Sequence, residues 1–424
     1  MRILVIGGGG REHALVWKLA QSRHTTKLFC APGNAGIAEL AECVPVEVAH
    51  LEKLTAFALE KKVDLTVVGP EVPLCAGVVD AFESQGLRIF GPTQRAAQLE
   101  GSKVFAKRLL LKSGVPTAPA EIFDESDAAR KYVRSIRAPM VVKADGLAAG
   151  KGVVVAASVA EAETAVVEMM EQKVFGAAGA QVIIEECLQG EELSVMALVD
   201  GQSFRVLASA QDHKRALDGD RGPNTGGMGA YSPTPLLDDK LAGQVADIFR
   251  RTLAGLRAEG IEYRGVLYAG LMMTDRGPQV LEFNCRFGDP ETQVVLPRLE
   301  SDLVDAIGAT MDGTLAQFSL QWTTDAAVCV VIAARGYPGP YERGLPIAGL
   351  KDAAALDKVS VFHAGTRRDA TGQVVTDGGR VLGVTALGDT IERAAQRAYE
   401  AVERIHFDGA QFRRDIAARA LRAR

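Results

Sequence analysis

The chain has 424 residues, of which 47% are hydrophobic and 24% charged, and its net charge is −5; this composition is ordinary for a folded protein of about two to four domains. The acidic balance excludes the broad basic surface that binds a nucleic-acid backbone. Because no apolar run approaches the roughly 20 residues of a membrane span and the chain begins with a strand pattern rather than a signal peptide, we expect a cytoplasmic protein with no nucleic-acid or membrane partner.

The cysteines and glycines narrow the class of protein further. Six cysteines are scattered without a C-x-x-C pair, which predicts reduced thiols and neither a zinc site nor a disulfide framework. The 44 glycines occur without repeats or low-complexity tracts. They therefore indicate tight turns and close approaches of the backbone to a ligand, rather than disorder.

Residues 1–101 alternate short apolar runs with helical patterns such as residues 51–62. This alternation predicts a parallel sheet with both faces covered. Each strand ends in a turn rich in glycine, proline or asparagine, and such turns share the sheet edge where open α/β sheets bind ligands. Turns favour these residues in any protein, so the alternative that they are only turns stays open. The predicted strands cover residues 3–6, 28–30, 65–68 and 88–90.

The first of these turns lies in the sequence IGGGGREHAL, residues 6–15. A glycine-rich turn between a strand and a helix exposes backbone N–H groups to a phosphate. The spacing does not support a dinucleotide site, because the third glycine of that fingerprint would have to replace Glu12 or His13. The turn is therefore predicted to hold a different phosphate.

A second glycine-rich stretch, residues 144–152, lies between predicted strands at 140–143 and 153–156. A Walker A loop opens into a helix, so this loop is instead predicted to cover a triphosphate as a lid. Farther along, the pattern predicts that residues 182–186 and 193–199 pair with each other through Gly190. The remaining predictions are a hairpin of residues 267–274 and 279–284, a buried strand at 326–333 and an amphipathic helix at 390–405.

The stretch from Leu281 to Gln293 holds the most specific chemistry in the chain. Alternate residues of a strand share a face, so Glu282 and Asn284 are predicted to point the same way. A carboxylate and a carboxamide suit Mg²⁺, and Arg286 beside them would stabilise charge on a transferring phosphoryl group. A solvated strand face is the alternative.

Two further groups of residues are candidates for nucleotide binding. Lys103, Lys143 and Lys151 supply cations, although an isolated lysine is usually only exposed. Lys143 ends an apolar strand, where a buried ammonium needs a partner that the glycine-rich loop could bring. Residues 185–188 resemble an adenine hinge, with Glu192 free to bind ribose hydroxyls.

Residues 211–231 have no apolar period, and long structureless stretches are usually functional loops or disorder. We expect a loop that contacts substrate. His213 within it is a candidate base, but no set of nucleophile, base and orienting residue is present. Covalent enzyme catalysis is therefore not expected.

Several long motifs occur in one order along the chain: GGREHA at 9–14, APGN at 31–34, KADGLAAGKGV at 143–153, GGMGAYSP at 226–233 and RFGDPExQ at 286–293. With these motifs the chain resembles the phosphoribosylamine–glycine ligase family of the ATP-grasp superfamily, also called glycinamide ribonucleotide synthetases. One departure from the wider superfamily is that no acidic metal ligand lies near Ala269 and Gly270, which leaves the coordination of a second metal open.

The resemblance implies an α/β and α+β multidomain fold of ATP-grasp architecture. It implies an N-terminal parallel α/β domain at residues 1–101 and a central ATP-grasp domain at 102–121 and 191–325. A mobile lid would cover residues 122–190, and a C-terminal α+β domain would cover 326–424. We expect a monomer, although the sequence does not fix the oligomeric state.

The resemblance also implies a reaction: ATP, glycine and 5-phosphoribosylamine give glycinamide ribonucleotide, ADP and phosphate through glycyl phosphate. The implied cofactors are ATP and Mg²⁺ or Mn²⁺, with ATP between the lid and the central sheet. The predicted catalytic residues are Arg286, Lys214 and Asp289, and the predicted metal ligands are Glu282 and Asn284. ATP is assigned to Lys103, Lys143, Gly150, Lys151, Glu185, Glu186, Cys187, Leu188 and Glu192. The other substrates are assigned to Gly9, Gly10, Arg11, Glu12, Asn34, Asp212, Gly226, Gly227 and Met228.

Two alternatives stay open from the sequence. The first is another ATP-grasp carboxylate–amine ligase or a biotin-dependent carboxylase component, which acceptance of glycine would separate from the family above. The second is a nucleotide-sensing binding protein with a degenerate site. The joint presence of Lys143, Glu282, Asn284 and Arg286 argues against degeneracy, and turnover of ATP would decide it.

Overall fold

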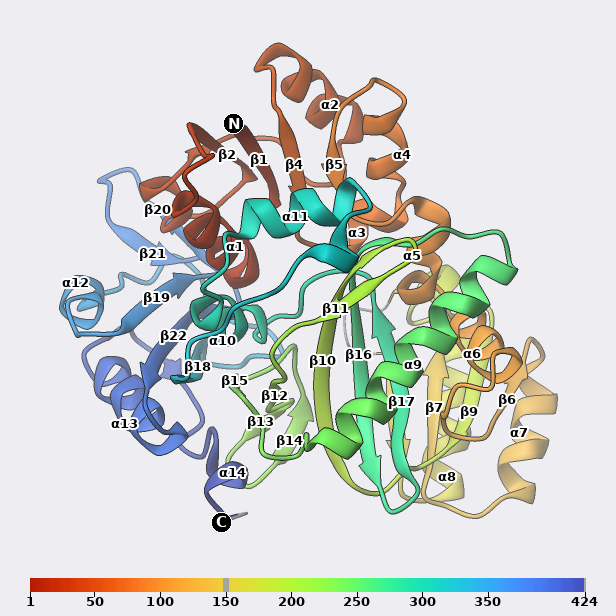
Figure 1. The fold of residues 1–424 in the computed structure, drawn as a ribbon. Coiled ribbons are helices and arrows are strands. Elements are labelled where there is room, and N and C mark those ends of the chain that lie inside the picture. Colours follow the sequence, from red (N-terminus) through yellow and green to blue (C-terminus); the bar gives the residue numbers. More distant parts are fainter. Residues whose placement is uncertain (148–151, 423–424) are drawn as a thin grey trace.

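The computed structural model describes residues 1–147 and 152–422. Four larger sheets and two two-stranded ribbons form the β-structure of these residues. Figure 1 shows the N-terminal sheet at the top, the lid sheet at the lower right, the C-terminal sheet at the lower left and the central sheet between them. Among the described residues, none of the helices has the length and apolar character needed to cross a membrane.

The N-terminal sheet confirms the predicted parallel α/β pattern. Its strands run parallel in the order β3-β2-β1-β4-β5. The order switches between β1 and β4, so the turns after these two strands meet at the edge where such sheets bind ligands. The strands are β1 (Arg2–Gly7), β2 (Lys27–Pro32), β3 (Glu42–Cys43), β4 (Leu65–Val68) and β5 (Ile89–Phe90). The helices are α1 (Gly10–Ala20), α2 (Leu51–Glu60), α3 (Glu71–Cys75), α4 (Val78–Glu83) and α5 (Gln94–Gly101).

The lid sheet is antiparallel in the order β6-β9-β7-β8, with two helices and its own apolar core. The predicted strands at 140–143, 153–156 and 182–186 are all present. The strands are β6 (Ala120–Phe123), β7 (Met140–Ala144), β8 (Val153–Ala156) and β9 (Val182–Glu186), and the helices are α7 (Ser126–Ser135) and α8 (Val159–Val166).

The central sheet has the order β11-β10-β16-β17, and α6 and α9 pack on it. Its β16–β17 hairpin confirms the predicted one, with Thr274 opposite Gly277 at the turn. The strands are β10 (Glu191–Asp200), β11 (Phe204–Val206), β16 (Arg264–Thr274) and β17 (Gly277–Asn284), and the helices are α6 (Lys103–Lys112) and α9 (Asp239–Ala258).

The predicted pairing of β9 with β10 is wrong. β9 pairs with β6 and β7, whereas β10 pairs with β11 and β16. The chain passes from one sheet to the other at Gly190, whose φ of +153° favours glycine. Two neighbouring apolar runs predict two strands, but they do not specify which core each strand faces.

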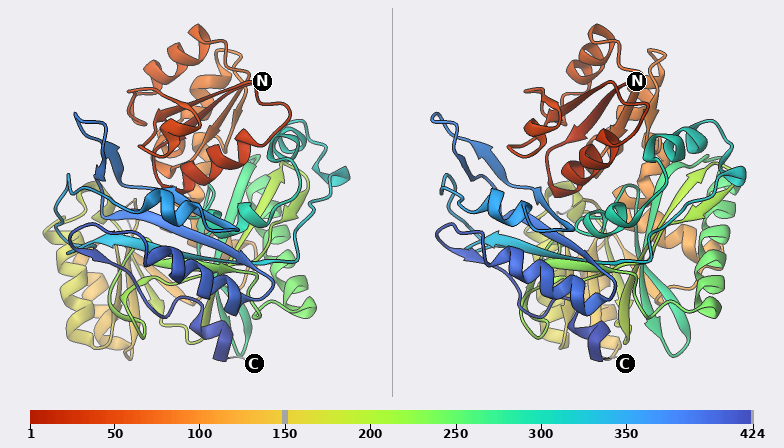
Figure 2. Two further views of the ribbon diagram at one scale, coloured as in Figure 1. Left: turned by 90° about the vertical axis from the view of Figure 1, so that its left-hand side faces the viewer. Right: turned by 60° about the vertical axis from the view of Figure 1, so that its left-hand side comes forward.

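The C-terminal sheet has the order β12-β15-β18-β22-β19, with β23 beside β18. Figure 2 shows this sheet below the N-terminal region and beside the central sheet. The predicted buried strand and terminal helix are present as β18 and α13. The elements are β12 (Gln211–Asp212), β15 (Gly229–Ser232), β18 (Ala326–Ala334), α12 (Leu350–Ala354), β19 (Val359–His363), β22 (Arg380–Gly388), α13 (Ile391–Val402), β23 (Ala410–Gln411) and α14 (Ala418–Arg422).

The expectation that residues 211–231 lack structure is also wrong. This segment supplies β12 and β15 to the C-terminal sheet and forms a hairpin of β13 (Arg215–Leu217) and β14 (Arg221–Asn224). Its strands are short and mostly polar, so no apolar period reveals them. β12 and β15 join the C-terminal sheet because β15 pairs with β18, about 100 residues farther along the chain.

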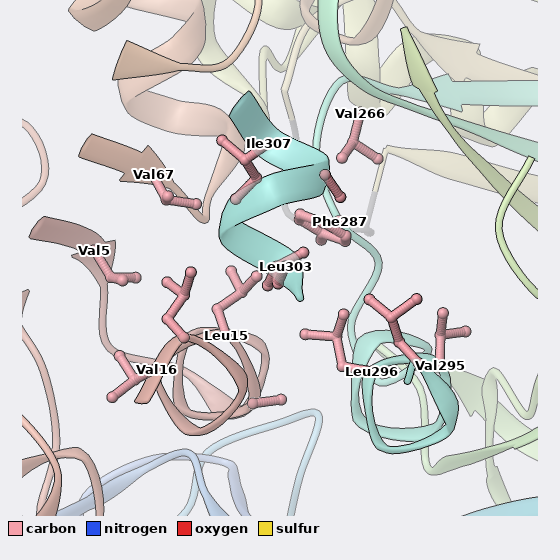
Figure 3. Packing of buried hydrophobic residues seen from close by; sticks show 14 of the residues in the cluster. Val5, Leu15, Val16, Val67, Val266, Phe287, Val295, Leu296, Leu303 and Ile307 are labelled. Atoms are coloured by element: carbon pink, nitrogen blue, oxygen red, sulfur yellow. The ribbon is translucent and has the colours of Figure 1, made fainter. Parts of the chain in front are cut away.

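A shared apolar core joins the N-terminal region to the rest of the molecule (Figure 3). Side chains of α1, β1 and β4 pack against α11 (Leu303–Met311), with α10 (Thr292–Val295) beside them. The residues labelled in this cluster are Val5, Leu15, Val16, Val67, Val266, Phe287, Val295, Leu296, Leu303 and Ile307. This packing fixes the ligand-binding edge of the N-terminal sheet relative to β17.

Candidate active site

One cleft takes side chains from all four regions. Its volume is about 480 Å³, within the usual range of small-molecule sites. The N-terminal region contributes Arg11 and Glu71, and the C-terminal region contributes Arg380, the first residue of β22. The charged residues of its lining are Arg11, Glu71, Glu100, Lys103, Lys107, Lys143, Glu185, Asp212, Lys214, Glu282, Arg286, Asp289, Glu291 and Arg380.

The predicted metal ligands Glu282 and Asn284 lie two residues apart on β17, and both line the cleft. Burial would raise the pKa of Glu282, but the surrounding cations, above all Lys214 and Lys143, hold it below its ordinary value. An ionised carboxylate beside a carboxamide oxygen fits a hard divalent cation such as Mg²⁺. Both side chains therefore meet the chemical requirements of the proposed metal site.

Arg286 is held beside these residues by two acids that the sequence analysis missed. Its Nη2 donates to Asn284 Oδ1 at 3.1 Å, and its guanidinium pairs with Glu71 at 3.3 Å and Glu100 at 3.1 Å. Although burial would lower the pKa of Arg286, Glu100 and Glu71 raise it. Glu71 lies just after β4, in one of the turns that the sequence analysis predicts at the ligand-binding edge of the sheet. No local sequence pattern distinguishes Glu100, near the end of α5.

Glu185, a predicted ATP contact, lies between two lysines. Its carboxylate is 2.8 Å from Lys143 Nζ and 3.0 Å from Lys107 Nζ. Lys143 also donates to the carbonyl of Leu281 at 3.0 Å, so two of its three N–H groups have partners among the described residues. These partners are Glu185 on β9 and Leu281 on β17, whereas residues 148–151 of the glycine-rich loop lie outside the described residues. Lys107 was missed because α6 is an ordinary amphipathic helix.

Lys103 starts α6 and lines the cleft near Glu282. Its Nζ donates to the carbonyl of Gly146 at 3.0 Å. Burial lowers the pKa of Lys103, while Glu282 opposes that shift and Lys143 adds to it. The other two predicted phosphate contacts, Gly150 and Lys151, lie outside the described residues.

The predicted adenine hinge spans the end of β9 and the two residues after it, and of its four residues Glu185 lines the cleft whereas Glu186, Cys187 and Leu188 do not. Glu186 pairs with Arg276 at 3.2 Å, Cys187 is half-buried and Leu188 is buried. The carboxylate of Glu192 is 2.5 Å from Lys214 Nζ. Nucleotide contacts by these residues stay predictions.

Asp212, the last residue of β12, and Lys214, just before β13, flank His213, and both line the cleft. Burial raises the pKa of Asp212 to about 7, against the effect of Lys214. Burial would lower the pKa of Lys214, but Glu192 and Asp212 raise it well above its ordinary value. His213 is fully buried outside the cleft lining, and burial lowers its pKa to about 4. The geometry therefore does not favour His213 as a base that reaches substrate.

The predicted phosphate turn lies at the start of α1. Gly9 N–H donates to Glu12 Oε2 at 2.6 Å, and Arg11 donates to Glu12 Oε1 at 2.6 Å and lines the cleft. Gly10 is close-packed, since an added Cβ would meet Gln293 Nε2 at 2.7 Å. The whole amide of Asn34 is engaged: it donates to the carbonyls of Gly8 and His363 and accepts from the backbone N–H groups of residues 36 and 37. Among these residues, Arg11 is the one whose side chain reaches the cleft.

Asp289 and Gly226 form one corner of the cleft with Arg380. Arg380 Nη2 is 3.1 Å from Asp289 Oδ2, and its Nη1 donates to the carbonyl of Gly226 at 2.6 Å. Burial would raise the pKa of Asp289, but Arg380 and Arg11 hold it below its ordinary value. Met228 is fully buried and Gly227 is also buried, outside the cleft lining. Arg380 was missed because it is about 90 residues from Asp289 and its local sequence carries no motif.

Family models match nearly the whole chain. The N domain of phosphoribosylglycinamide synthetase matches residues 1–100, its ATP-grasp (A) domain residues 101–292 and its C domain residues 327–419. A protein of Caldanaerobacter subterraneus named phosphoribosylamine–glycine ligase is 49% identical over 420 residues, which are 99% of this chain and 100% of that protein. One of Xanthomonas axonopodis with the same name is 54% identical over 425 residues, 99% and 98% of the two chains.

Solved structures agree with the described fold. The phosphoribosylamine–glycine ligase of Thermotoga maritima has a TM-score of 0.87 and 36% identity, over 98% of this chain and 100% of that one. The biotin carboxylase domain of Hydrogenobacter thermophilus 2-oxoglutarate carboxylase has a TM-score of 0.74 at 17% identity, over 97% and 91% of the two chains. The second likeness concerns the fold alone. Together these similarities confirm the predicted ATP-grasp architecture.

Proposed function

The chain belongs to the phosphoribosylamine–glycine ligase family, and from this membership we propose that its cleft joins glycine to 5-phosphoribosylamine with ATP as the energy source. As a member of this family, the chain is an ATP-grasp ligase of purine biosynthesis that uses ATP and a divalent metal. The predicted family is thereby confirmed. The products of the proposed reaction are glycinamide ribonucleotide, ADP and phosphate.

One observation carries the proposal: a single cleft holds both the carboxylate of Glu282 among cations and the side chain of Arg11, from the turn that opens α1. The cations suit the anionic oxygens of a triphosphate and of an attacking carboxylate, which repel each other without them. Arg11, which lines the same cleft, belongs to the turn predicted to hold the phosphoribosyl group. The two reacting substrates can thus meet within one site.

The proposed chemistry has two steps. A carboxylate oxygen of glycine attacks the γ-phosphorus of ATP, the bond to the bridging oxygen breaks, and ADP and glycyl phosphate form. The nitrogen of phosphoribosylamine then attacks the acyl carbon, phosphate leaves with the bonding electrons, and the nitrogen loses a proton. Lys103, Lys143 and Arg286 would stabilise the phosphoryl charge in the first step. Asp289 and the segment 212–229 would orient glycine and the amine.

Glu282 and Asn284 are the residues that would hold Mg²⁺ or Mn²⁺. A bound divalent cation would neutralise phosphate oxygens and polarise the phosphoryl group. The chain's own part is to present two oxygen ligands while Lys143 and Arg286 offer N–H donors beside them. Closure of the lid would exclude water, which otherwise hydrolyses an acyl phosphate.

The direct test is release of ADP by the purified chain with ATP and Mg²⁺. Glycine and freshly generated 5-phosphoribosylamine are added separately and then together, and Mn²⁺ replaces Mg²⁺ in a parallel series. We expect release that needs both substrates. Release with bicarbonate, or with another acid but not glycine, would reject the proposed substrate while leaving the fold unaffected.

The metal assignment is tested by Glu282→Ala. Loss of one group that stabilises transition-state charge typically costs about 10²-fold or more in kcat. Glu60→Gln is the matched control, because Glu60 is exposed on α2 and is not part of the cleft lining. Near-normal turnover of Glu282→Ala at saturating Mg²⁺ would reject the assignment.

A further inference from the structure

Two backbone turns from distant parts of the chain meet at one corner of the cleft. The first is the glycine turn at residues 226–227, and the second is the turn at Asp289–Pro290. Gly227 has φ of +111°, and an added Cβ would lie 2.4 Å from Pro290 Cδ. The two turns are thus in direct contact, and only glycine fits between them without strain. We call these two turns together with Arg380 the junction.

Arg380 binds both turns at once. Its Nη1 donates to the carbonyls of Gly226 at 2.6 Å, Gly227 at 3.4 Å and Asp289 at 3.0 Å. Its Nη2 is 3.1 Å from the Asp289 carboxylate. Two of its three nitrogens are therefore committed within the protein, and the planar guanidinium spans acceptors that a lysine ammonium would not span.

The C-terminal sheet holds this arginine in place. Arg380 is the first residue of β22, and it lies opposite Ala333 of β18 in the sheet. Tyr337, which follows β18, accepts a hydrogen bond from Gly226 N–H at 3.0 Å through its hydroxyl. Gly379 leaves room for this tyrosine, since an added Cβ would lie 2.3 Å from Tyr337 Cδ2.

The turns that Arg380 binds belong to the catalytic cleft. Asp289, Gly226 and Tyr337 all line it. The glycine turn is also tied to Lys214, because Thr225 N–H donates to the carbonyl of Lys214 at 2.7 Å. Displacement of this turn would therefore move the backbone that carries Lys214.

We propose that Arg380 is a positioning residue, which joins the glycine turn to Asp289 and so makes the C-terminal sheet part of the site for glycine and phosphoribosylamine. This inference rests on the proposed function for its substrates. Although Arg380 lines the cleft, both of its Nη groups are engaged by the two turns, so it acts through them. It should govern binding of the two smaller substrates and leave ATP, at the Lys103 and Lys143 end, little affected.

The first test asks whether the planar guanidinium of Arg380 is needed or whether a positive charge at this position is enough. It uses Arg380→Gln, which removes the charge, and Arg380→Lys, which keeps it. We expect kcat/KM for glycine or phosphoribosylamine to fall roughly 10- to 100-fold in both variants, as for loss of charge-assisted hydrogen bonds. KM for ATP should change less than about twofold, within the scatter of surface substitutions. Arg404→Gln, in an exposed pair with Glu400, is the control and should behave as the parent chain. Full recovery in Arg380→Lys would overturn the proposal, because charge alone would then suffice.

The second test does not depend on turnover. Hydrogen exchange of the Gly227 and Met228 amides should become about tenfold faster or more in Arg380→Gln and stay unchanged in Arg404→Gln. Unchanged exchange in Arg380→Gln would overturn the proposal even if activity fell. If the parent chain releases no ADP with both substrates, the proposed function fails, while hydrogen exchange still decides whether Arg380 holds the turn.

Tyr337→Phe keeps the proposal falsifiable if Arg380→Gln does not fold. This variant removes only the hydroxyl that accepts from Gly226 N–H. We expect hydrogen exchange of the Gly227 and Met228 amides to become a few-fold faster. KM for glycine or phosphoribosylamine should rise a few-fold, as for loss of one neutral hydrogen bond. Parent-like values for both quantities would contradict a role for the C-terminal sheet at this turn.

Discussion

At one end of the cleft the lining is dominated by charge, and at the other end by shape and hydrogen bonds to the backbone. The metal end, formed by Lys103, Lys143, Glu282 and Asn284, gathers cations around one ionised carboxylate. The junction instead holds two turns in van der Waals contact and binds their carbonyls through one arginine. The metal end should therefore respond most to changes of charge, and the junction to changes of volume and geometry.

The largest effect is expected for Lys143→Met at the metal end. Partners among the described residues engage two of the three N–H groups of Lys143, and the third can serve a ligand, so its loss should lower kcat by roughly 10²- to 10³-fold. The measurement is steady-state ADP release. Because Glu185 keeps Lys107 as a partner, the free energy of unfolding should change much less than activity.

Lys107→Met is the matched control for that comparison. Lys107 donates to Thr117, to the carbonyl of Ala118 and to Glu185, so its three N–H groups are all used within the protein. Glu185 keeps Lys143 as a partner, but Thr117 and the carbonyl of Ala118 lose this donor, so the free energy of unfolding should fall by roughly 1–3 kcal/mol, which denaturant titration measures. Equal losses of activity in the two lysine variants would contradict the division of roles.

The contact between α1 and β19, beside the junction, should depend on pH. Burial lowers the pKa of His13 to about 3 and that of His363 to about 4, below the ordinary value near 6.5. Between pH 6.5 and 4 the unfolded chain binds more protons than the folded chain, so stability falls as pH falls. Each histidine should cost about 2 kcal/mol of unfolding free energy between pH 7 and 5.

His13→Asn checks the pH prediction. The backbone N–H of His363 donates to His13 Nδ1 at 2.7 Å, and the asparagine oxygen offers an acceptor in a similar place. Urea titrations of this variant should show that the free energy of unfolding falls less between pH 7 and pH 5 than in the parent chain. The difference should be about 2 kcal/mol, the contribution of one histidine. An unchanged difference between the two pH values would contradict the assignment of His13.

A smaller effect is expected for Gly227→Ala at the junction. The added methyl group meets Pro290, and the positive φ disfavours alanine, so the free energy of unfolding should fall by roughly 1–3 kcal/mol. KM for glycine or phosphoribosylamine should rise with it. A parent-like melting midpoint and KM would show that the junction tolerates added volume.

The smallest effect, of opposite sign, is expected for Gly243→Ala. Gly243 is exposed in α9, and nothing lies within 4 Å of an added Cβ. Alanine should therefore stabilise the chain by roughly 0.5–1 kcal/mol through helix propensity. This variant is the control for Gly227→Ala. If Gly243→Ala is stabilised, a lower free energy of unfolding in Gly227→Ala stems from the position of Gly227 and not from the loss of a glycine as such.

The two ends of the cleft also differ in how far the sequence predicted them. Glu282 and Asn284 share a strand face, so their proximity follows from the period of a strand. Lys107 and Glu100 were missed, because each reaches its partner only through packing between elements. The segment 211–231 was misread for the same reason, since its pairing with β18 has no local pattern.

The sequence by itself determined the family, the parallel N-terminal sheet and the strand that presents the proposed metal ligands. These follow from local periodicity and from motifs of contiguous residues, whose geometry is fixed within a few residues. Only the tertiary structure decided that β9 and β10 belong to different sheets, that Glu71 and Glu100 hold Arg286, and that Arg380 binds the two turns at the cleft. Each of these depends on where distant segments come to lie, which is set by burial of shared cores and by satisfaction of buried hydrogen-bonding groups across the whole chain.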